Sequence, residues 1–388
     1  MLGRRRWMGT VAGLCLLSAL GAGCGKKDGA SPAAANEWKV GAYLSLSGAE
    51  TQFGKDTQEG TELAVEEINA KGGVKGKKVR VIFEDDKSNP QEATNKVLQL
   101  INRDKVVALL GEVASSRSKA GGIVANKNKV PMITPSSTNP DVTKVGPFVF
   151  RVCFTDDVQG QMGARFIKEK LGKNKVAVLY ASDDLYSSGL ANEFKSEAKK
   201  LGLNVVAEKS FLKSETNFTT YLNEIKSAEP EAIYAPVYYN AMVPIARQAK
   251  AAGLAGSMFV GGDGWHADSL VHDAGEEMEG AYFTNHFSPD MPAPLSQAFV
   301  KKYVEKFKRE PSALAAQGYD AAMLLFDAMG RAKGDTPEAI RDAIAETKDF
   351  QGATGAITIN ADRNADKPIV IVQIKGKKFT YFDTVSTK

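Results

Sequence analysis

The sequence carries almost no excess of charge of one sign, and this limits its partners. Its 388 residues include 50 lysines and arginines against 46 aspartates and glutamates, giving a formal net charge of +4. Three of the basic residues, Arg4, Arg5 and Arg6, lie in the first 23 residues, which hold no acidic residue, so the remainder has 47 basic against 46 acidic side chains. Nucleic-acid binding needs a clustered basic excess. We therefore expect no nucleic acid among the partners of this protein.

The sequence also lacks the motifs by which many α/β enzymes are recognised. It contains no Walker motif, no G-x-G-x-x-G, no G-x-S-x-G and no cysteine–histidine spacing for zinc. His266, His272 and His286 fall in one short segment, but exposed polar histidines are a simpler interpretation than a metal site. We expect a protein that is not an enzyme and that holds neither a metal nor a cofactor.

Cysteine is scarce, and apolar runs long enough to span a membrane are missing after the N-terminus. Residues 1–23 combine the three arginines with a mostly apolar stretch, which predicts an export signal. Small residues then precede Cys24, as in a bacterial lipobox, so we expect Cys24 to be lipidated and residues 24–36 to form a membrane tether. Cleavage at an ordinary signal-peptidase site nearby is the alternative. Cys15 would leave with the signal and Cys153 would have no partner, so no internal disulfide is expected.

From residue 38 onward, strand patterns and helix patterns alternate with little chain left over. An apolar run at 38–44 is followed by a polar loop and a helix pattern at 57–73, and the same rhythm continues along the chain. Such alternation predicts parallel sheets with helices on both faces. A break near residues 144–157 separates two series, and this predicts two doubly wound, Rossmann-like α/β lobes.

Polar and aromatic residues gather in the loops that follow the predicted strands, where doubly wound sheets bind ligands. Ser115 and the triplet at 136–138 (Ser-Ser-Thr) lie where helices begin, and free N–H groups at helix starts favour an anion. Because neither hydroxyl cluster contains Lys or Arg, a carboxylate fits better than a phosphate. Asp263, in a glycine-rich loop of the second series, could meet a cation, and Tyr186 and Tyr238 could supply aromatic walls.

A carboxylate-binding face opposite an ammonium-binding acid, with aromatic walls, describes a site for an α-amino acid. Taken one at a time, these residues have simpler interpretations: the serines as helix caps, Asp263 as a turn residue and the tyrosines as core residues. Their joint location at the ends of predicted strands is what favours a binding site.

Longer stretches of the chain resemble a known family. The resemblance is carried by "VGAYLSLSGAETQFGKDTQEGTELAVEEINAKGGVKGKKVRVIFEDD", "VPMITPSSTNP", "YSSGLANEF", "ARQAKAAG" and "SALAAQGYDA". Over essentially its full mature length the chain resembles the leucine/isoleucine/valine-binding family, the substrate-binding proteins of bacterial ABC transporters. The resemblance implies the type I periplasmic binding protein fold, in which three crossovers join two lobes around a cleft. It assigns 37–156 and 286–351 to lobe I, and 157–285 and 352–388 to lobe II.

The resemblance also implies roles for individual residues. Ser115 matches the serine that holds the ligand carboxylate, and Ser136 and Thr138 match the strand-end residues that hold its ammonium and carboxylate groups. Asp263 matches the acid that binds the ammonium, although the branched-chain binders have Glu there, and a shorter acid could draw the ligand deeper or admit a water. The aromatic residues that would close over the ligand and the residues that would line its side-chain pocket are Tyr186, Tyr238, Phe53, Val113, Ala114 and Trp265.

The function implied by the resemblance is capture of a small solute. An amino acid, in the first place leucine, isoleucine or valine, would dock on lobe I, and rotation about the hinge would bring lobe II onto it. The closed, lipid-anchored protein, periplasmic or on the cell surface, would then meet the membrane permease and ATPase subunits of an ABC transporter. The alternatives are a binder of another small amino acid, amide or carboxylate, and a sensory module that presents its ligand to a receptor.

Overall fold

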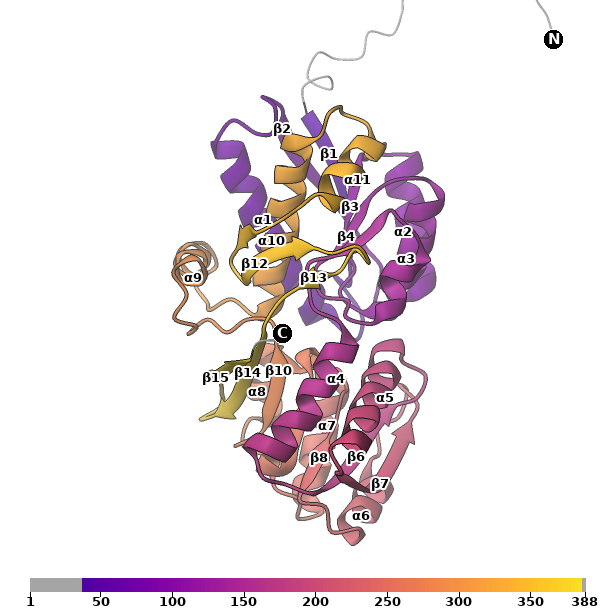
Figure 1. Cartoon of the computed structure of the whole chain (residues 1–388), viewed down its shortest axis with the longest axis vertical. Helices are drawn as coiled ribbons and strands as arrows, with labels where there is room; N and C mark the ends of the chain where they lie inside the picture. The colour runs from indigo at the N-terminus through magenta and orange to yellow at the C-terminus, as the bar shows by residue number, and fades with distance from the viewer. Residues whose placement is uncertain (1–36, 386–388) are drawn as a thin grey trace, which may run out of the picture. The chain divides into compact units, whose positions relative to one another are not determined.

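The computed structural model describes residues 37–385, which form two open α/β sheets and one small antiparallel sheet (Figure 1). The predicted signal peptide (1–23), Cys24 and the predicted tether (24–36) lie outside the described residues. Lobe I and lobe II denote below the parts of the chain built on the first and on the second open sheet. The predicted α/β architecture with two mainly parallel sheets is confirmed.

The sheet of lobe I is fully parallel, with the strand order β2-β1-β3-β4-β5. Its strands are β1 (Glu37–Leu44), β2 (Lys78–Asp85), β3 (Ala108–Leu110), β4 (Met132–Thr134) and β5 (Val149–Arg151). β1 buries apolar side chains on both faces, with Val40 and Ala42 in one core and Tyr43 in another. Burial on both faces is characteristic of a parallel sheet that is covered by helices.

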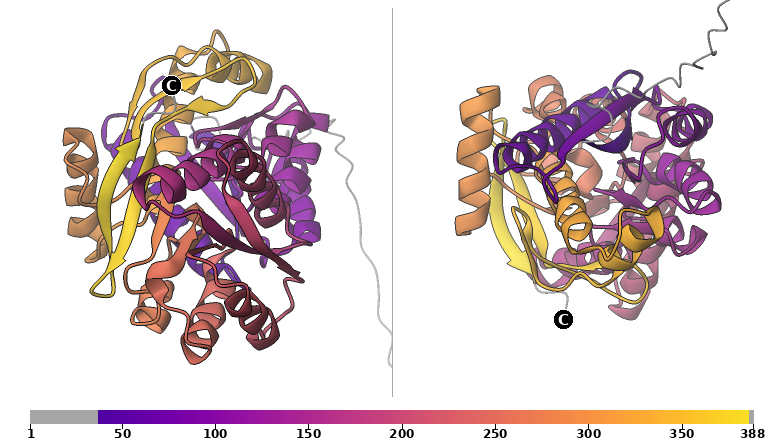
Figure 2. Two further views of the ribbon diagram at one scale, coloured as in Figure 1. Left: turned by 60° about the horizontal axis from the view of Figure 1, so that its bottom comes forward. Right: turned by 90° about the horizontal axis from the view of Figure 1, so that it is seen from above.

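Helices cover both faces of this sheet. The helices of this part of the chain are α1 (Thr51–Ala70), α2 (Pro90–Asn102), α3 (Ser115–Lys127), α9 (Pro294–Phe307), α10 (Ala313–Arg331) and α11 (Pro337–Ala345). α1 and α10 lie side by side over one face, where the core contains Trp38, Phe150 and Leu325 (Figures 1 and 2). α2 and α3 cover the other face, over Leu109 and Met132. The carboxyl ends of the strands are left for loops.

The sheet of lobe II has the strand order β15-β14-β10-β9-β8-β6-β7. Its strands are β6 (Lys175–Ala181), β7 (Asn204–Phe211), β8 (Ala232–Tyr234), β9 (Phe259–Gly261), β10 (Tyr282–Asn285), β14 (Ile369–Lys375) and β15 (Lys378–Val385). The strands from β6 to β10 pair in parallel, whereas β14 and β15 add an antiparallel edge. Its helices are α4 (Asp156–Arg165), α5 (Leu185–Lys200), α6 (Thr219–Ser227), α7 (Tyr239–Ala251) and α8 (Asp268–Ala274).

The third sheet is small and antiparallel. It consists of β11 (Phe350–Gly352), β12 (Gly355–Ile359) and β13 (Ala365–Asp366). Ile357 and Ile359 are buried in the same core as Trp38 and the inner face of α10. The segment from 352 to 366, assigned to lobe II from the sequence, therefore packs with lobe I, because the apolar side chains of β12 find their partners there.

The chain passes between the two open sheets three times. The first passage follows β5, the second follows β10, and the third leads from β13 into β14. Cys153 lies in the first passage, where it is buried and free. Three connections of this kind allow the two lobes to move about a common hinge region.

Candidate functional site

Lobe I presents three hydroxyl side chains at the carboxyl ends of β3 and β4. Ser115 is the first residue of α3, and Ser136 and Thr138 lie in the loop after β4. Their exposed fractions are only 1%, 3% and 1%. Because β3 and β4 are neighbours in a parallel sheet, their following loops meet at one edge, as the sequence pattern predicted.

Ser137, the middle residue of the triplet, anchors the loop after β4. Its hydroxyl lies 2.7 Å from the Val113 carbonyl oxygen and 2.6 Å from the Ser118 hydroxyl. The buried guanidinium of Arg151 donates to the Ser137 carbonyl oxygen at 2.6 Å and to the Asn139 carbonyl oxygen at 2.8 Å. Ser137 therefore has a structural role that is distinct from that of its two neighbours.

Ser136 has a hydroxyl group that remains unpaired. Ser136 Oγ is buried and forms no hydrogen bond with the described part of the chain, whereas the Thr138 hydroxyl is directed at the buried Asp156 carboxyl. Leaving such a group unpaired costs about 1–3 kcal/mol, so a buried unpaired hydroxyl commonly marks a place where another molecule completes the bond. Ser115 Oγ accepts a hydrogen bond from the Asn139 backbone N–H at 3.2 Å and retains its own proton for donation.

Lobe II presents the buried carboxylate of Asp263 in the turn after β9. The Tyr186 hydroxyl and the Gln159 amide each lie 3.0 Å from Asp263 Oδ1, and Gln159 Oε1 accepts the Asp263 backbone N–H at 2.9 Å. Burial and the charge of Asp263 raise the pKa of Tyr186 well above its ordinary value, so its hydroxyl stays protonated and donates. Tyr186 and Gln159 are neutral donors, so these two contacts bring no positive charge to the Asp263 carboxylate.

His286 completes the surroundings of Asp263. Its Nε2 lies 3.2 Å from Asp263 Oδ2, and its ring stacks on Phe154 with centroids 3.7 Å apart. Burial lowers the pKa of His286 even though the Asp263 carboxylate opposes the shift, so the imidazole is neutral at pH 7 and can donate one N–H. Burial likewise lowers the pKa of His266 to about 3. The expectation of exposed histidines is thus wrong for His266 and His286, and holds for His272.

Aromatic rings from both lobes form the walls of the site. Tyr186 and Tyr238 of lobe II stack with centroids 4.8 Å apart and planes inclined by 6°. Phe53, from the first turn of α1, packs edge-to-face against Tyr238, with ring centroids 5.5 Å apart. Rings in these arrangements contribute apolar surface without adding charge.

A cavity of about 220 Å³ lies where these groups converge. Eight of the ten residues predicted for the site line it, together with two that were not predicted. The lining consists of Phe53, Val113, Ser115, Ser136, Thr138, Tyr186, Tyr238, Asp263, Gly264 and Leu314.

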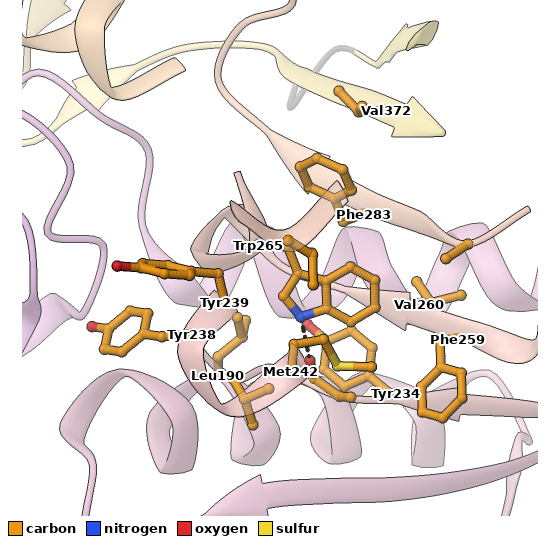
Figure 3. Close-up of a cluster of buried hydrophobic side chains, with 14 of the residues drawn as sticks. Leu190, Tyr234, Tyr238, Tyr239, Met242, Phe259, Val260, Trp265, Phe283 and Val372 are labelled. Carbon is orange, nitrogen blue, oxygen red and sulfur yellow. Dashed lines mark hydrogen bonds between the residues drawn. The ribbon is translucent and has the colours of Figure 1, made fainter. Parts of the chain in front are cut away.

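Trp265 and Ala114 are the two predicted residues that do not line the cavity. Trp265 is fully buried in the apolar core of lobe II, where its indole N–H donates to the Ala235 carbonyl oxygen at 3.1 Å (Figure 3). The ring packs over Gly261 and near Phe283, so this side chain fills the core of lobe II and not the ligand pocket. Ala114 precedes α3, and its backbone N–H donates to the Glu112 carboxylate at 2.6 Å.

Reasoning from strand ends missed Gln159, His286, Leu314 and Gly264. Gln159 and Leu314 belong to helices α4 and α10, and His286 begins the second passage between the sheets. Of these four, only Gly264 could have been recognised from the sequence, because a residue without a side chain next to Asp263 leaves space for a ligand beside the carboxylate. The other three are brought to the site by tertiary structure.

Between residues 37 and 385 no helix is both long and apolar enough to cross a bilayer. The same residues contain no group of three or more His, Cys, Asp or Glu side chains that could hold a metal ion.

Residues 37–378 match the sequence profile of the periplasmic binding protein family, and the chain belongs to this family. The Leu/Ile/Val-binding protein of Escherichia coli K12 is 30% identical over 366 residues, covering 94% of this chain and 95% of that protein. The family consists of solute-binding proteins and not of enzymes, and membership implies export to the periplasm.

Solved structures are similar over the same range. A leucine-binding protein from Thermotoga maritima has a TM-score of 0.86 and 37% identity, covering 90% of this chain and 99% of that one. A branched-chain amino acid transporter substrate-binding protein from Streptococcus pneumoniae, in complex with isoleucine, has a TM-score of 0.85 and 33% identity, with coverage of 90% and 99%. These similarities confirm the type I periplasmic binding protein fold.

Ligand chemistry differs among more distant structures of the same fold. A solute-binding protein of an ABC transporter from R. palustris, in complex with benzoate, has a TM-score of 0.81 and 25% identity. The similarity covers 90% of this chain and 96% of the R. palustris chain. The fold therefore does not fix the ligand, and specificity has to be argued from the residues of the cavity.

Proposed function

We propose that this protein captures a small aliphatic α-amino acid, in the first place leucine, isoleucine or valine, in the cavity between its lobes. It then delivers the amino acid to the permease and ATPase subunits of an ABC importer. The observation that carries the proposal is a set of hydroxyl donors on lobe I, among them the unpaired Ser136 Oγ, that faces a buried carboxylate on lobe II. A zwitterion satisfies both at once.

The polar groups divide between the two charges of such a ligand. Ser115, Ser136 and Thr138 can donate to a carboxylate, and the start of α3 adds a favourable helix dipole. Asp263 accepts from the ammonium group, while Tyr186 and Gln159 keep its carboxylate in position. Burying a zwitterion is unfavourable unless each charge is matched, so both lobes are required for tight binding.

The apolar lining supports an aliphatic side chain. Phe53, Val113 and Leu314 line the cavity together with the two stacked tyrosines, and none of these residues carries a charge. The Leu/Ile/Val-binding protein and the isoleucine complex among the relatives support the same ligand class.

A thermal-shift screen tests this proposal. The purified protein is heated with each of the twenty L-amino acids, γ-aminobutyrate, urea and benzoate. A ligand present at a thousand times its dissociation constant stabilises the folded state by about 4 kcal/mol, which raises Tm visibly. We expect the largest shifts with leucine, isoleucine and valine. A largest shift with a ligand that has no α-ammonium group would contradict the assignment of Asp263.

A second candidate is a binder of a simple carboxylate. The benzoate complex of a relative favours it, and lobe I alone could hold the carboxylate group. It leaves the charge of Asp263 unmatched in a site where Asp263 is only 7% exposed, and for this reason we rank it below an amino acid. Benzoate in the screen separates the two candidates.

We further propose that Cys24 carries a lipid that anchors the protein at the membrane, near the permease. Small residues before Cys24 and the preceding export signal support this proposal. Metabolic labelling with radioactive palmitate tests it. Label in the wild type and none in Cys24→Ala is expected, whereas equal label in both, or none in either, would overturn the anchor. A partner that is a receptor instead of a permease would be revealed by uptake that does not depend on this protein.

A further inference from the structure

Beside the ligand cavity, lobe I contains a buried ionic cluster around Arg117. Its guanidinium lies 2.8 Å from Glu50 Oε2 and 3.0 Å from Glu112 Oε2, and Asp86 Oδ1 is 3.8 Å away. All four side chains are at most 2% exposed. Three carboxylates thus surround a single cation.

The carboxylates of this cluster outnumber its positive charge. Burial and the charge of Glu112 raise the pKa of Asp86 to about 8, against the opposing effects of Arg117 and a hydrogen bond from Ser45. With Asp86 protonated, Glu50 and Glu112 still face one guanidinium. A buried carboxylate in this situation is stabilised by any further donor that reaches it.

Those further donors come from lobe II. Asn240 Nδ2 donates to Glu50 Oε1 at 3.3 Å, and Lys213 Nζ lies 3.8 Å from the same oxygen. In the described part of the chain, the partners of Glu50 Oε1 are these two lobe II side chains, whereas Oε2 is bound by Arg117 within lobe I. Separation of the lobes would therefore leave Oε1 to water.

Asp184, a residue of the same lobe, orients the Lys213 side chain toward this contact. Lys213 Nζ lies 3.2 Å from Asp184 Oδ2, while Asp184 Oδ1 caps the start of α5 by accepting the Ser187 backbone N–H at 3.0 Å. The ammonium also lies 5.8 Å from the ring centroid of Tyr238. The lysine is thus shared between a fixed carboxylate of lobe II and Glu50 of lobe I.

The same turn of chain joins the lobes at a second contact. The Tyr239 hydroxyl donates to the Ala49 carbonyl oxygen at 3.2 Å and accepts the Gln52 backbone N–H at 3.2 Å. Its ring lies 4.9 Å from that of Phe53, which lines the ligand cavity. The segment 49–53 therefore carries both inter-lobe contacts and one wall of the site.

Lys213 and Asn240 do not line the ligand cavity. Both line a separate cavity of about 290 Å³ on the other side of Tyr238, with Asp184 and Phe211. Tyr238 borders both cavities and so divides them. Any effect of Lys213 or Asn240 on a ligand is therefore indirect, through the position of the lobes or through Tyr238.

We propose that Lys213 and Asn240, by holding Glu50 across the cleft, are positioning residues that keep the lobes closed and lengthen the residence of the bound amino acid. The proposal rests on the proposed function, since it extends the time for which a captured ligand stays in the cleft. Contacts made only in the closed state raise the population of that state, and with it the apparent affinity.

Binding kinetics test the proposal with a matched control. L-leucine association and dissociation are measured by stopped-flow tyrosine and tryptophan fluorescence for Lys213→Met, Asn240→Leu and Lys213→Arg. The control is Lys209→Met, because Lys209 lies on β7 close to Lys213 but pairs with Glu224 inside lobe II. We expect koff to rise about three- to tenfold in Lys213→Met with kon nearly unchanged, and to recover in Lys213→Arg.

We call the contact of Lys213 and Asn240 with Glu50 the latch. Other kinetic results would overturn its proposed role. Unchanged koff in both Lys213→Met and Asn240→Leu would show that the contact has no effect on closure. An equal rise in Lys209→Met would assign the effect to surface charge in general. A change confined to kon would indicate electrostatic steering of the ligand and not retention of it.

A measurement without ligand separates failure of the latch from failure of the proposed function. Spin labels on cysteines introduced at the exposed positions Lys127 of lobe I and Lys199 of lobe II report the distance between the lobes. We expect a smaller closed population in Lys213→Met than in the wild type and in Lys209→Met. If L-leucine does not bind, the proposed function fails, and the distance between the spin labels then tests the latch by itself. Equal closed populations in the wild type and in Lys213→Met would overturn the latch.

Discussion

In the proposed function, Asp263 carries the charge on which recognition of an amino acid depends. In Asp263→Asn the shape of the side chain is kept, and Tyr186 and Gln159 still find a hydrogen-bonding partner, but the negative charge is lost. A hydrogen bond to a charged group contributes about 1.5–3 kcal/mol, so we expect Kd for leucine to rise between about tenfold and 100-fold. Isothermal titration calorimetry measures the change. Asp273→Asn, at an exposed position of the same lobe, is the control, and equal affinities for all three proteins would contradict the role of Asp263.

The triplet from Ser136 to Thr138 offers an internal comparison between binding and structure. Ser136→Ala removes an unpaired hydroxyl, so we expect weaker leucine binding with little loss of stability. Ser137→Ala removes the bonds to the Val113 carbonyl and the Ser118 hydroxyl, so we expect the free energy of unfolding to fall by about 1–3 kcal/mol. Urea denaturation and calorimetry on the two variants check this contrast. A loss of stability in Ser136→Ala equal to that in Ser137→Ala would show that both serines are structural.

Asp86 provides a prediction about pH. Its pKa is raised to about 8 in the folded protein, against about 4 for an unfolded chain, so the folded state retains a proton that the unfolded state releases between these values. The stabilisation is full below about pH 4 and is lost as the pH rises through about 8. In Asp86→Asn this group no longer titrates, so the fall in unfolding free energy with pH should be shallower, by at most about 1.4 kcal/mol per unit. Urea titrations from pH 5 to 9 measure it, and parallel profiles for the two proteins would contradict the raised pKa.

At the scale of helices and strands, the close contact between α1 and α10 depends on a glycine. A side chain at Gly60 would meet the Ala315 backbone, with its Cβ 2.7 Å from the carbonyl carbon. Gly60→Ala must therefore push the helices apart, and we expect a loss of about 1–3 kcal/mol in unfolding free energy. Gly330→Ala, in α10 where nothing lies within 4 Å of the added atom, is the control and should gain up to about 1 kcal/mol from helix propensity. Urea denaturation that ranks the two variants in the opposite order would contradict this account of α1 and α10.

Most strands and helices could be predicted from the sequence, because their apolar residues recur with the period of the element. The start of α1 could not. Residues 51–56 are mainly polar and were expected to be a loop, but Phe53 is buried against Tyr238, and Asp56 pairs with Arg309 at 2.6 Å. Contacts made by residues far away in the chain hold this turn in a helix, and local periodicity carries no information about them. The same holds for β12, whose apolar residues gave a strand but not its lobe.

The candidate site was predictable to the extent that strand ends and family resemblance specify it. Ser115, Ser136, Thr138 and Asp263 follow strands, and parallel sheets bring such loops to one edge. Trp265 was wrongly placed in the pocket, because one residue after Asp263 the chain turns its side chain into the core (Figure 3). Leu314 was missed because it lies in the first turn of α10 and follows no strand end, so tertiary packing alone brings it to the cavity.

At the scale of the whole molecule, the proposed function depends on two lobes that each hold half of the candidate site. Lobe I offers hydroxyl donors, lobe II offers a carboxylate, and neither half alone can match both charges of a zwitterion. The inter-lobe contacts of Glu50 and Tyr239 then act on the closed state without touching the ligand.

The central claim is that the site recognises both charges of an α-amino acid. The most direct test is isothermal titration of the wild-type protein with L-leucine and with 4-methylpentanoate, which keeps the carboxylate and the branched chain but lacks the ammonium group. We predict that leucine binds at least about tenfold more tightly, because only leucine matches the charge of Asp263. Equal or tighter binding of 4-methylpentanoate would contradict the account and would identify the site as one for a simple carboxylate.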